Sequence, residues 1–384
     1  MTETPLPRSQ FPVCERFHYL NHAGVSPLPI AAQKAIAEIT DDFVRAGAAN
    51  FDHWQDAQER ARSAAAALLG VDPSDLAFVK NTTEGLGFVA NGLSWKRGDR
   101  VIVPDFEFPS TIYPWLSLRE LGVEVDIIKP VGETHALPIE VFAEALEDNE
   151  RRGGTKLVAA SWVQYARGYR LDAPRLVELA HRYGAMVCLD VIQGAGLIPT
   201  ALEDWNVDFA MADSHKWMLG PVGIGVFYVA SRCRHLLRPL EPGWASVIHR
   251  DDFENLDLAY DDTARRFEGG TYNNITICGM HASIDLILKA GTEQLWRHVD
   301  TLADHLATGL GGLGATVLSD RAEGRSGIVT FAVPGSDTST VADLVAQRGF
   351  QVSVRGGGVR VSPHGYNSLR EIDDLISALR SSAL

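Results

Sequence analysis

The segment DSHKWMLGP, residues 213–221, sets Lys216 between a histidine and a tryptophan, directly after an apolar stretch typical of a buried strand. The chain has only 7 lysines against 28 arginines, so a lysine in an apolar setting stands out. A lysine can react as a nucleophile when partial removal from water lowers its pKa and frees the amine. It can also lie with its stem along the core and its ammonium in water, and the segment alone leaves both interpretations open.

Two further features carry groups that could serve the same chemistry. Asp190 ends the apolar stretch 185–190, where a carboxylate is costly unless something pairs with it. Thr82 and Thr83 open a predicted helix, whose free backbone N–H groups and dipole attract anions. Each feature also has an ordinary structural interpretation. Asp190 could be a strand-end cap or half of an ion pair, and the threonines could belong to a common N-cap with Glu84 in the first turn.

All three features follow predicted strands of one sheet, and such sheets bind ligands at the carboxyl ends of their strands. A site for pyridoxal phosphate needs a lysine that bonds to the aldehyde, an anion site for the phosphate, and an acid that keeps the pyridine nitrogen protonated. Lys216, the threonine pair and Asp190 supply these three parts in a workable order along the chain. The sequence therefore predicts a pyridoxal phosphate site in which Lys216 and Asp190 are the catalytic residues.

Helical and strand patterns alternate through the first two thirds of the chain. Amphipathic helical segments occur at 29–47, 53–70 and 175–184. Short, mostly apolar stretches occur at 75–81, 99–105, 124–130, 156–163, 185–190, 208–213 and 225–229. Strands that are apolar on both faces and alternate with helices indicate a mostly parallel sheet covered on both sides. The predicted fold class is therefore α/β.

After about residue 275 the pattern changes. A long helical stretch at 279–313 is followed by strand patterns and a final helix, which indicates a smaller α+β domain. These strand patterns lie at 315–319, 327–334 and 350–363. We therefore expect an N-terminal arm at 1–15, a large cofactor-binding domain at 16–265, and a linking helix with a small C-terminal domain at 266–384. The arm is able to join the small domain.

The composition is ordinary for a soluble globular protein of 384 residues, with 46% hydrophobic and 22% charged residues. A formal net charge of −14 argues against nucleic acid or an anionic membrane as a partner, since neither attracts an acidic protein. No apolar run approaches the roughly 18 residues of a membrane span, and the N-terminus lacks the apolar segment of a signal peptide. We expect a cytoplasmic protein without a metal site, whose cysteines are small buried hydrophobes. These are Cys14, Cys188, Cys233 and Cys278.

Two motifs carry a resemblance to a known family. The segments LDVIQGAG, residues 189–196, and SHKWMLGPVGIGVFY, residues 214–228, resemble the class V aminotransferase group of fold-type I pyridoxal phosphate enzymes. That group includes cysteine desulfurases, cystine lyases, isopenicillin N epimerases and kynureninases. The match runs from YLNHAGVSP at 19–27 to RVSPHGYNS at 360–368, nearly the whole chain. It implies the fold of that group, pyridoxal 5′-phosphate as cofactor, a homodimer with shared active sites, and an amino acid as substrate.

The resemblance also implies roles for individual residues around the cofactor. Lys216 would form the Schiff base, Asp190 would face the pyridine nitrogen, and Gln193 would bond to the phenolic oxygen. The ring of Phe108 would stack on the pyridine. The phosphate would be held by Thr82, Thr83 and His215. Across the dimer interface, the partner's phosphate would be reached by Gly270 and Thr271.

A second group of residues would bind the amino acid. Arg360 matches the arginine that binds the substrate carboxylate, a task that suits a bidentate guanidinium, and Arg355 is a second candidate. The pocket for the substrate side chain is expected to be lined by His22, Tyr165, Arg167 and Trp244.

Two departures from the cysteine desulfurases bear on the phosphate and on the reaction. Asp213 stands where they have a serine near the phosphate. Since a carboxylate would repel the phosphate, we expect Asp213 to pair with a nearby cation, and Ser214 is left as an alternative phosphate donor. The desulfurases also carry a nucleophilic cysteine in a loop between two arginines. Here only GGGV separates Arg355 from Arg360, and no cysteine follows Cys278, which argues against a persulfide on the enzyme.

The reaction type is less closely constrained, because β-elimination, transamination and epimerisation share the residues named above. The HKW motif and an aromatic stacking residue resemble the epimerase and cystine lyase branch, and no second cationic anchor for a dicarboxylate is evident. We therefore expect β-elimination of the C–S lyase type at Cα of an L-amino acid, with an aminotransferase or an amino-acid epimerase as alternatives. A cofactor-binding regulator is disfavoured, because the chain has neither spare length nor a basic segment for a DNA-binding module.

Overall fold

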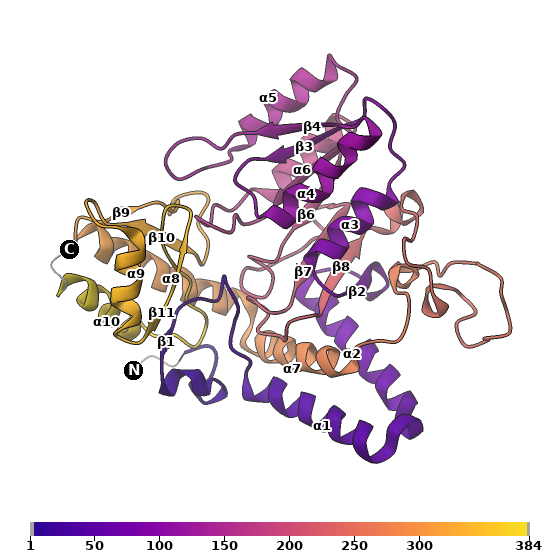
Figure 1. Ribbon diagram of the computed structural model, residues 1–384, viewed down its shortest axis with the longest axis horizontal. Helices are drawn as coiled ribbons and strands as arrows, with labels where there is room; N and C mark the ends of the chain where they lie inside the picture. Colours follow the sequence, from indigo (N-terminus) through magenta and orange to yellow (C-terminus); the bar gives the residue numbers. More distant parts are fainter. Residues whose placement is uncertain (1–3, 382–384) are drawn as a thin grey trace.

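The computed structural model describes residues 4–381, which form a large body around one sheet and a smaller body beside it (Figure 1). The large sheet has the strand order β2-β8-β7-β6-β5-β3-β4. Neighbouring strands are parallel except for β8, which runs antiparallel to β7 and β2. The strands are β2 (Leu76–Val79), β3 (Arg100–Pro104), β4 (Glu124–Ile128), β5 (Leu157–Ser161), β6 (Met186–Asp190), β7 (Phe209–Asp213) and β8 (Gly225–Val229). The predicted α/β class with a mostly parallel sheet is confirmed.

Helices connect and cover these strands. Between successive strands run α3 (Thr82–Gly92), α4 (Pro109–Ser117), α5 (Ile139–Glu150) and α6 (Ala173–Arg182). Two helices precede the sheet, α1 (Ile30–Ala46) and α2 (Phe51–Leu69), and α7 (Asn274–Ala290) packs against both of them in the lower part of Figure 1. Helix α2 is closed by Gly70, whose φ of 65° ends the helix in a left-handed conformation.

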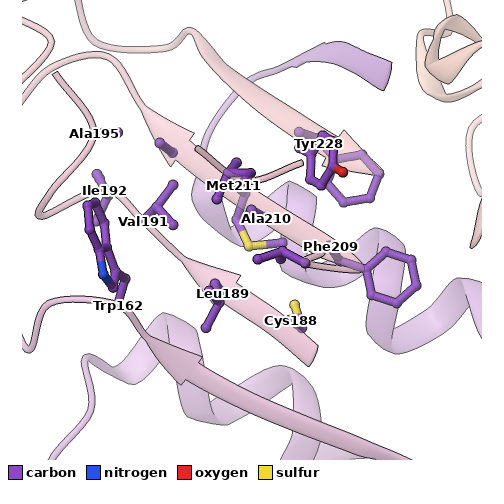
Figure 2. Packing of buried hydrophobic residues seen from close by; sticks show 14 of the residues in the cluster. Trp162, Cys188, Leu189, Val191, Ile192, Ala195, Phe209, Ala210, Met211 and Tyr228 are labelled. Carbon is purple, nitrogen blue, oxygen red and sulfur yellow. The ribbon is translucent and has the colours of Figure 1, made fainter. Parts of the chain in front are cut away.

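The two central strands that lead to the candidate residues are buried on both faces. Figure 2 shows this packing along β6 and β7, where the buried side chains include Cys188, Leu189, Phe209, Ala210 and Met211. Such strands are stable only between two covering layers, which leaves polar groups to the strand ends. Asp190 is the last residue of β6 and Asp213 the last of β7, so both carboxyl groups lie at the carboxyl edge of the sheet.

The smaller body, at the left of Figure 1, is built on an antiparallel sheet in the order β12-β13-β10-β9. Its elements are α8 (Thr292–Gly311), β9 (Thr316–Val317), β10 (Val329–Ala332), α9 (Thr338–Ala346), β12 (Ser353–Arg355), β13 (Gly358–Val361) and α10 (Leu369–Arg380). The N-terminal strand β1 (His18–Tyr19) pairs with β11 (Phe350–Gln351), and Leu20 joins the core of this body. The N-terminal segment therefore joins the smaller body, and the domain boundaries at 15/16 and 265/266 stay predictions.

Two expectations from the sequence need correction. The helical stretch predicted at 279–313 is divided into α7 and α8, which meet at Gly291 with a φ of 81°. Cys188 and Cys233 are buried as expected, but Cys14 and Cys278 are only half-buried, and all four are free.

Residues 4–381 contain no helix that is long and apolar enough to cross a membrane. Nor do they hold a group of three or more His, Cys, Asp or Glu side chains arranged for a metal ion.

Candidate active site

A cavity of about 390 Å³ lies where the carboxyl ends of β2, β6 and β7 face the β12–β13 hairpin of the smaller body. It is lined by residues at or after the ends of β2, β3, β5, β6 and β7, by the N-terminal segment 23–25, and by two arginines of the hairpin. Most of the predicted site residues line this cavity, namely Thr82, Thr83, Phe108, Tyr165, Asp190, Gln193, His215, Lys216, Arg355 and Arg360. Five predicted residues do not line it: His22, Arg167, Trp244, Gly270 and Thr271.

Lys216 is held in the cavity by a tight loop that follows β7. Its carbonyl oxygen accepts hydrogen bonds from the hydroxyl of Ser26 (2.6 Å) and from the backbone N–H of Leu219 (3.0 Å). The next residue, Trp217, is fully buried and donates from Nε1 to Oε1 of Gln193 at 2.8 Å. Burial lowers the pKa of Lys216 to about 8, although the nearby Asp190 opposes this. The amine is therefore available as a nucleophile close to neutral pH.

Asp190 is buried at the end of β6 and makes only neutral hydrogen bonds. Its Oδ1 accepts from the backbone N–H of Ile192 at 3.0 Å, and its Oδ2 accepts from the hydroxyl of Thr111 at 3.3 Å. Burial raises its pKa, and no lysine or arginine in residues 4–381 forms an ion pair with it. The alternative that Asp190 is half of a structural ion pair is therefore wrong for the described chain. A buried acid facing a cavity is suited to hold a proton on a basic ring nitrogen.

The start of α3 contributes both a common cap and groups for an anion. Asn81 caps the helix by accepting from the backbone N–H of Glu84 at 2.9 Å, so the ordinary N-cap is present. Even so, the hydroxyl of Thr82 is buried at the cavity and has no partner among the described residues. Thr83 is exposed at the same helix start. The helix N-terminus therefore presents unused donors to the cavity.

Asp213 and Ser214 do not behave as the sequence analysis expects. The only basic group paired with Asp213 in residues 4–381 is His215, whose Nδ1 lies 3.5 Å from Asp213 Oδ2. Burial and Lys216 lower the pKa of His215 to about 4, so the imidazole is neutral and the expected cation is missing. Burial raises the pKa of Asp213 to about 7. Ser214 is turned away from the cavity, since its hydroxyl donates to the carbonyl of Pro221 at 2.6 Å.

Aromatic and amide side chains line the part of the cavity around Lys216. The Lys216 Nζ lies 5.8 Å from the centroid of the Phe108 ring, which meets Tyr165 edge-on with ring centroids 5.4 Å apart. Gln193 donates from Nε2 to the carbonyl of Ala23 at 3.0 Å, which leaves its second N–H for a ligand. Phe108 is 45% exposed and lines the cavity, so part of its ring is accessible to a ligand.

The two arginines of the hairpin bring positive charge to the cavity. Arg360 is buried, donates from Nη1 to the carbonyl of Tyr165 at 2.6 Å, and makes no ion pair with a carboxylate of residues 4–381. Burial and the neighbouring Arg355 lower its pKa to about 10. Arg355 is exposed and likewise has no carboxylate partner in the described chain. Arg355 is therefore a second cationic group at the cavity, beside Arg360.

A two-residue turn explains how the hairpin reaches the cavity without a loop. Gly356 and Gly357 have φ values of 59° and 82°, the left-handed pair that a two-residue hairpin turn requires. The turn leaves no room for an inserted segment between Arg355 and Arg360. No cysteine of the described residues lines the cavity.

The five predicted residues that are absent from the cavity have other surroundings. Arg167 donates from Nε to the carbonyl of Gly356 at 3.0 Å, and the ring of Trp244 meets Phe253 edge-on with centroids 6.0 Å apart. His22 is fully buried, with Nδ1 at 2.8 Å from the carbonyl of Ser362 and Nε2 at 2.7 Å from the hydroxyl of Tyr366. Both ring nitrogens are therefore occupied. Gly270 and Thr271 line a separate cavity of about 300 Å³ on the same chain.

Sequence reasoning missed a buried carboxyl group behind the cavity. Glu107 accepts from the backbone N–H of Ser161 at 2.7 Å and from its hydroxyl at 2.5 Å, and Ser161 lines the cavity. Burial raises the pKa of Glu107 to about 7. The signal was present in the segment DFEFPS, where an acidic residue stands between two phenylalanines directly after a strand.

These groups meet the requirements of the predicted cofactor. Unpartnered donors at α3 and His215 suit a phosphate, Lys216 offers an amine, and Asp190 offers a buried acid. The volume of about 390 Å³ lies within the roughly 300–1,000 Å³ that is typical of small-molecule sites. The residues present therefore fit pyridoxal phosphate.

Comparisons with known proteins agree with this geometry. The family described as aminotransferase class-V matches residues 18–382. A probable cysteine desulfurase of Methanothermobacter thermautotrophicus is 27% identical, over 98% of this chain and 97% of that protein. An uncharacterised aminotransferase of Bacillus subtilis is 26% identical, over 98% and 97%.

Solved structures share the whole fold. The apo structure of a cysteine desulfurase from Thermococcus onnurineus has a TM-score of 0.87 at 25% identity and covers 100% of both chains. A cystine C–S lyase in complex with its product, cysteine persulfide, has a TM-score of 0.87 at 25% identity and covers 96% of this chain and 99% of that one. The chain therefore belongs to the aminotransferase class-V family of pyridoxal phosphate-dependent enzymes.

Proposed function

We propose that this enzyme eliminates a sulfur substituent from Cβ of an L-amino acid, a reaction of the C–S lyase type. The observation that carries the proposal is the cavity itself, where the Lys216 amine and the unpaired Arg360 guanidinium meet without a cysteine of the described chain. Relatives and structural neighbours that act on cysteine or cystine support the same reaction class.

The roles of the residues follow from their chemistry. When bound, pyridoxal phosphate withdraws electrons from Cα and so weakens the bonds to that atom. Arg360 binds and orients the α-carboxylate, while Lys216 takes the proton from Cα. Asp190 holds the proton on the ring nitrogen, and Phe108 stacks on the ring. Loss of the sulfur substituent from Cβ, followed by hydrolysis, gives a sulfur product, ammonia and a keto acid.

The hairpin supports elimination over the route of the desulfurases. A persulfide on the enzyme needs a cysteine thiolate that reaches the sulfur of the substrate. The tight turn at Gly356 and Gly357 replaces the loop that would carry it, and no cysteine of the described residues lines the cavity. We therefore propose that the sulfur product leaves the site as a small molecule.

The position of Arg355 indicates a class of substrate and favours one of the alternative reactions. A second unpaired guanidinium suits a substrate with a second anionic group, such as the distal carboxylate of a disulfide amino acid. Transamination of a dicarboxylic amino acid is the second candidate, and Arg355 is the observation in its favour. Epimerisation and a regulatory role have no comparable support.

The holoenzyme should be incubated with single L-amino acids, including cysteine, cystine and aspartate, while sulfide or thiol, ammonia and keto acid are measured. The proposal expects equal amounts of ammonia and keto acid from a sulfur amino acid, without build-up of pyridoxamine phosphate. Stoichiometric conversion to the pyridoxamine form by a dicarboxylic amino acid, reversed by a keto acid, would contradict it and support transamination.

We further propose a homodimer with shared active sites in a reducing compartment such as the cytoplasm. Four free cysteines fit a reducing compartment. Gly270 and Thr271 line a cavity other than that of Lys216 on the same chain, which fits a role at the partner's site.

A further inference from the structure

The cavity holds an acidic residue that the proposed cofactor should repel. Asp213, at 8% exposure, lines the cavity together with Thr82 and His215, the residues proposed to hold the phosphate. Its Oδ1 is buried and has no hydrogen-bond partner among the described residues, and the same holds for Thr82 Oγ1 and His215 Nδ1. Three buried polar atoms without partners in one cavity indicate a ligand group that bonds to all of them.

No cation neutralises this carboxyl group. His215 is close, but its imidazole is neutral because burial lowers its pKa to about 4. Lys216 and the backbone N–H of Thr82 act to lower the pKa of Asp213. Burial, supported by the charge of Asp190, outweighs both and raises that pKa to about 7.

The other charged groups near the cavity do not alter this balance. Arg355 and Arg360 reach the cavity from the smaller body, and neither forms an ion pair with Asp213. On α3, Glu84 is paired with Lys80 at 2.7 Å and does not line the cavity. Asp213 therefore has a proton available near neutral pH.

We propose that the protonated carboxyl group of Asp213 donates a hydrogen bond to the phosphate group of the cofactor, so that binding of the cofactor takes up a proton. The inference rests on the proposed cofactor. Above its second pKa of about 6, a phosphate ester is a dianion that only accepts hydrogen bonds, so each protein group that touches it must donate. The hydroxyl of Thr82 and the N–H of neutral His215 meet this requirement, and a carboxyl group meets it only when protonated.

The proposal predicts how affinity depends on pH. In the free protein Asp213 ionises near pH 7, and a bound dianion moves this ionisation to higher pH. Between the two values, binding of a phosphate-bearing ligand takes up about one proton, and its Kd rises about tenfold per pH unit. Binding of a ligand with the same ring but no phosphate should lack this proton uptake and this rise in Kd.

The test compares pyridoxine 5′-phosphate with pyridoxine, binding to cofactor-free protein at pH 8. Neither ligand has an aldehyde, so neither bonds to Lys216, and ionisation of the ring is common to both. Calorimetry in buffers of different ionisation enthalpy counts the protons taken up. The phosphorylated ligand is expected to take up about one proton more than pyridoxine.

Two variants test whether Asp213 is the group that takes up the proton. Asp213→Asn keeps the shape and a donor but cannot titrate, so the difference in proton uptake should fall to about zero. At pH 9 this variant should bind pyridoxine 5′-phosphate at least tenfold more tightly than the unchanged protein. Glu84→Gln is the matched control, because it removes an acid from the same helix start outside the cavity and should leave proton uptake unchanged.

Equal proton uptake for the two ligands in the unchanged protein would overturn the inference. So would a pH dependence that persists in a folded Asp213→Asn variant. The measurement on the unchanged protein decides the matter even if that variant fails to fold. Failure to bind pyridoxine 5′-phosphate at any pH would instead overturn the proposed cofactor.

Discussion

At the residue scale, the amine of Lys216 should react at a lower pH than an ordinary lysine. Burial lowers its pKa to about 8, so the amine is protonated below that pH and free above it. Cofactor-free protein should therefore capture pyridoxal with a rate that rises through about pH 8, compared with about 10.4 for an exposed lysine. Absorbance gives the rate, and borohydride fixation with peptide mapping gives the site.

Lys216→Ala should abolish this fixation, and Lys156→Ala, on a lysine paired with Asp99, should not change it. A midpoint near 10, or fixation on another lysine, would remove Lys216 from its proposed role.

Variants of Arg360 and Arg355 should differ in which substrates they affect. Arg360→Lys keeps the charge but loses the bidentate fork, so KM for every amino acid should rise about 10- to 100-fold with cofactor binding unchanged. Arg355→Met should raise KM for cystine, which has two carboxylates, far more than KM for a monocarboxylic substrate. Steady-state kinetics on both substrates check this. Equal effects of Arg355→Met on both would show that Arg355 does not bind the second carboxylate.

The sequence predicts residues at strand ends better than it predicts residues in contacts between distant segments. Asp190 ends one buried strand and Lys216 follows its neighbour, so the sheet brings both to one edge. His22 belongs to a segment whose position depends on the smaller body, and the fold encloses it against Ser362 and Tyr366. The ionisation of Asp213 could not be predicted, because it depends on burial and on which neighbours are charged.

At the scale of elements, the loop after β6 supports the loop that carries Lys216. Gly196 has a φ of 97°, and a Cβ there would lie 2.6 Å from the backbone oxygen of Trp217. Gly196→Ala should therefore lower the free energy of unfolding by about 2–5 kcal/mol, from backbone strain and overpacking together. Urea denaturation measures the loss, and a reduced capacity to retain cofactor should accompany it.

Gly184→Ala is the matched control for that prediction. Gly184 has a φ of 72°, but nothing lies within 4 Å of an added Cβ, so only strain of about 1–2 kcal/mol remains. Equal losses in the two variants would mean that contact with Trp217 contributes nothing.

Strands and helices with a strong local sequence pattern were predictable. Features that depend on contacts with a neighbouring element were not. Strands β2, β5 and β7 are buried on both faces and lie close to their predicted positions. The antiparallel direction of β8 could not be predicted, because the apolar pattern of a strand does not depend on its direction in the sheet. The division of the predicted helix at 279–313 depends on Gly291, which a helix can also contain.

At the scale of the whole molecule, the order of strands along the sheet creates the site. Strands β6 and β7 are neighbours, while β12 and β13 come from a separate sheet near the C-terminus. The cavity therefore lies between two bodies, and a change in their relative position would alter the distance between Lys216 and Arg360. Sequence patterns indicate both bodies but carry no information on how they meet.

The large body also exposes apolar side chains on a segment that extends away from it. Residues 247–258 project at the right of Figure 1, and Phe253, Leu256 and Leu258 are 75%, 92% and 61% exposed. Large exposed apolar groups on one segment indicate a surface that another protein covers. Gly270 and Thr271, a short distance further along the chain, line a cavity other than that of Lys216.

We therefore expect sedimentation to show a dimer whose interface includes this segment. Replacing both Phe253 and Leu256 with Asp should give monomers that lose cofactor, since charge would be buried in an apolar contact and the residues proposed for the partner's phosphate would be removed. Leu369→Asp is the control, because Leu369 is 41% exposed at the first position of α10, where an acid suits the helix dipole. A monomeric protein that retains its cofactor tightly would exclude shared active sites, and the phosphate would then depend on residues of one chain, among them Thr82, Thr83, Asp213 and His215.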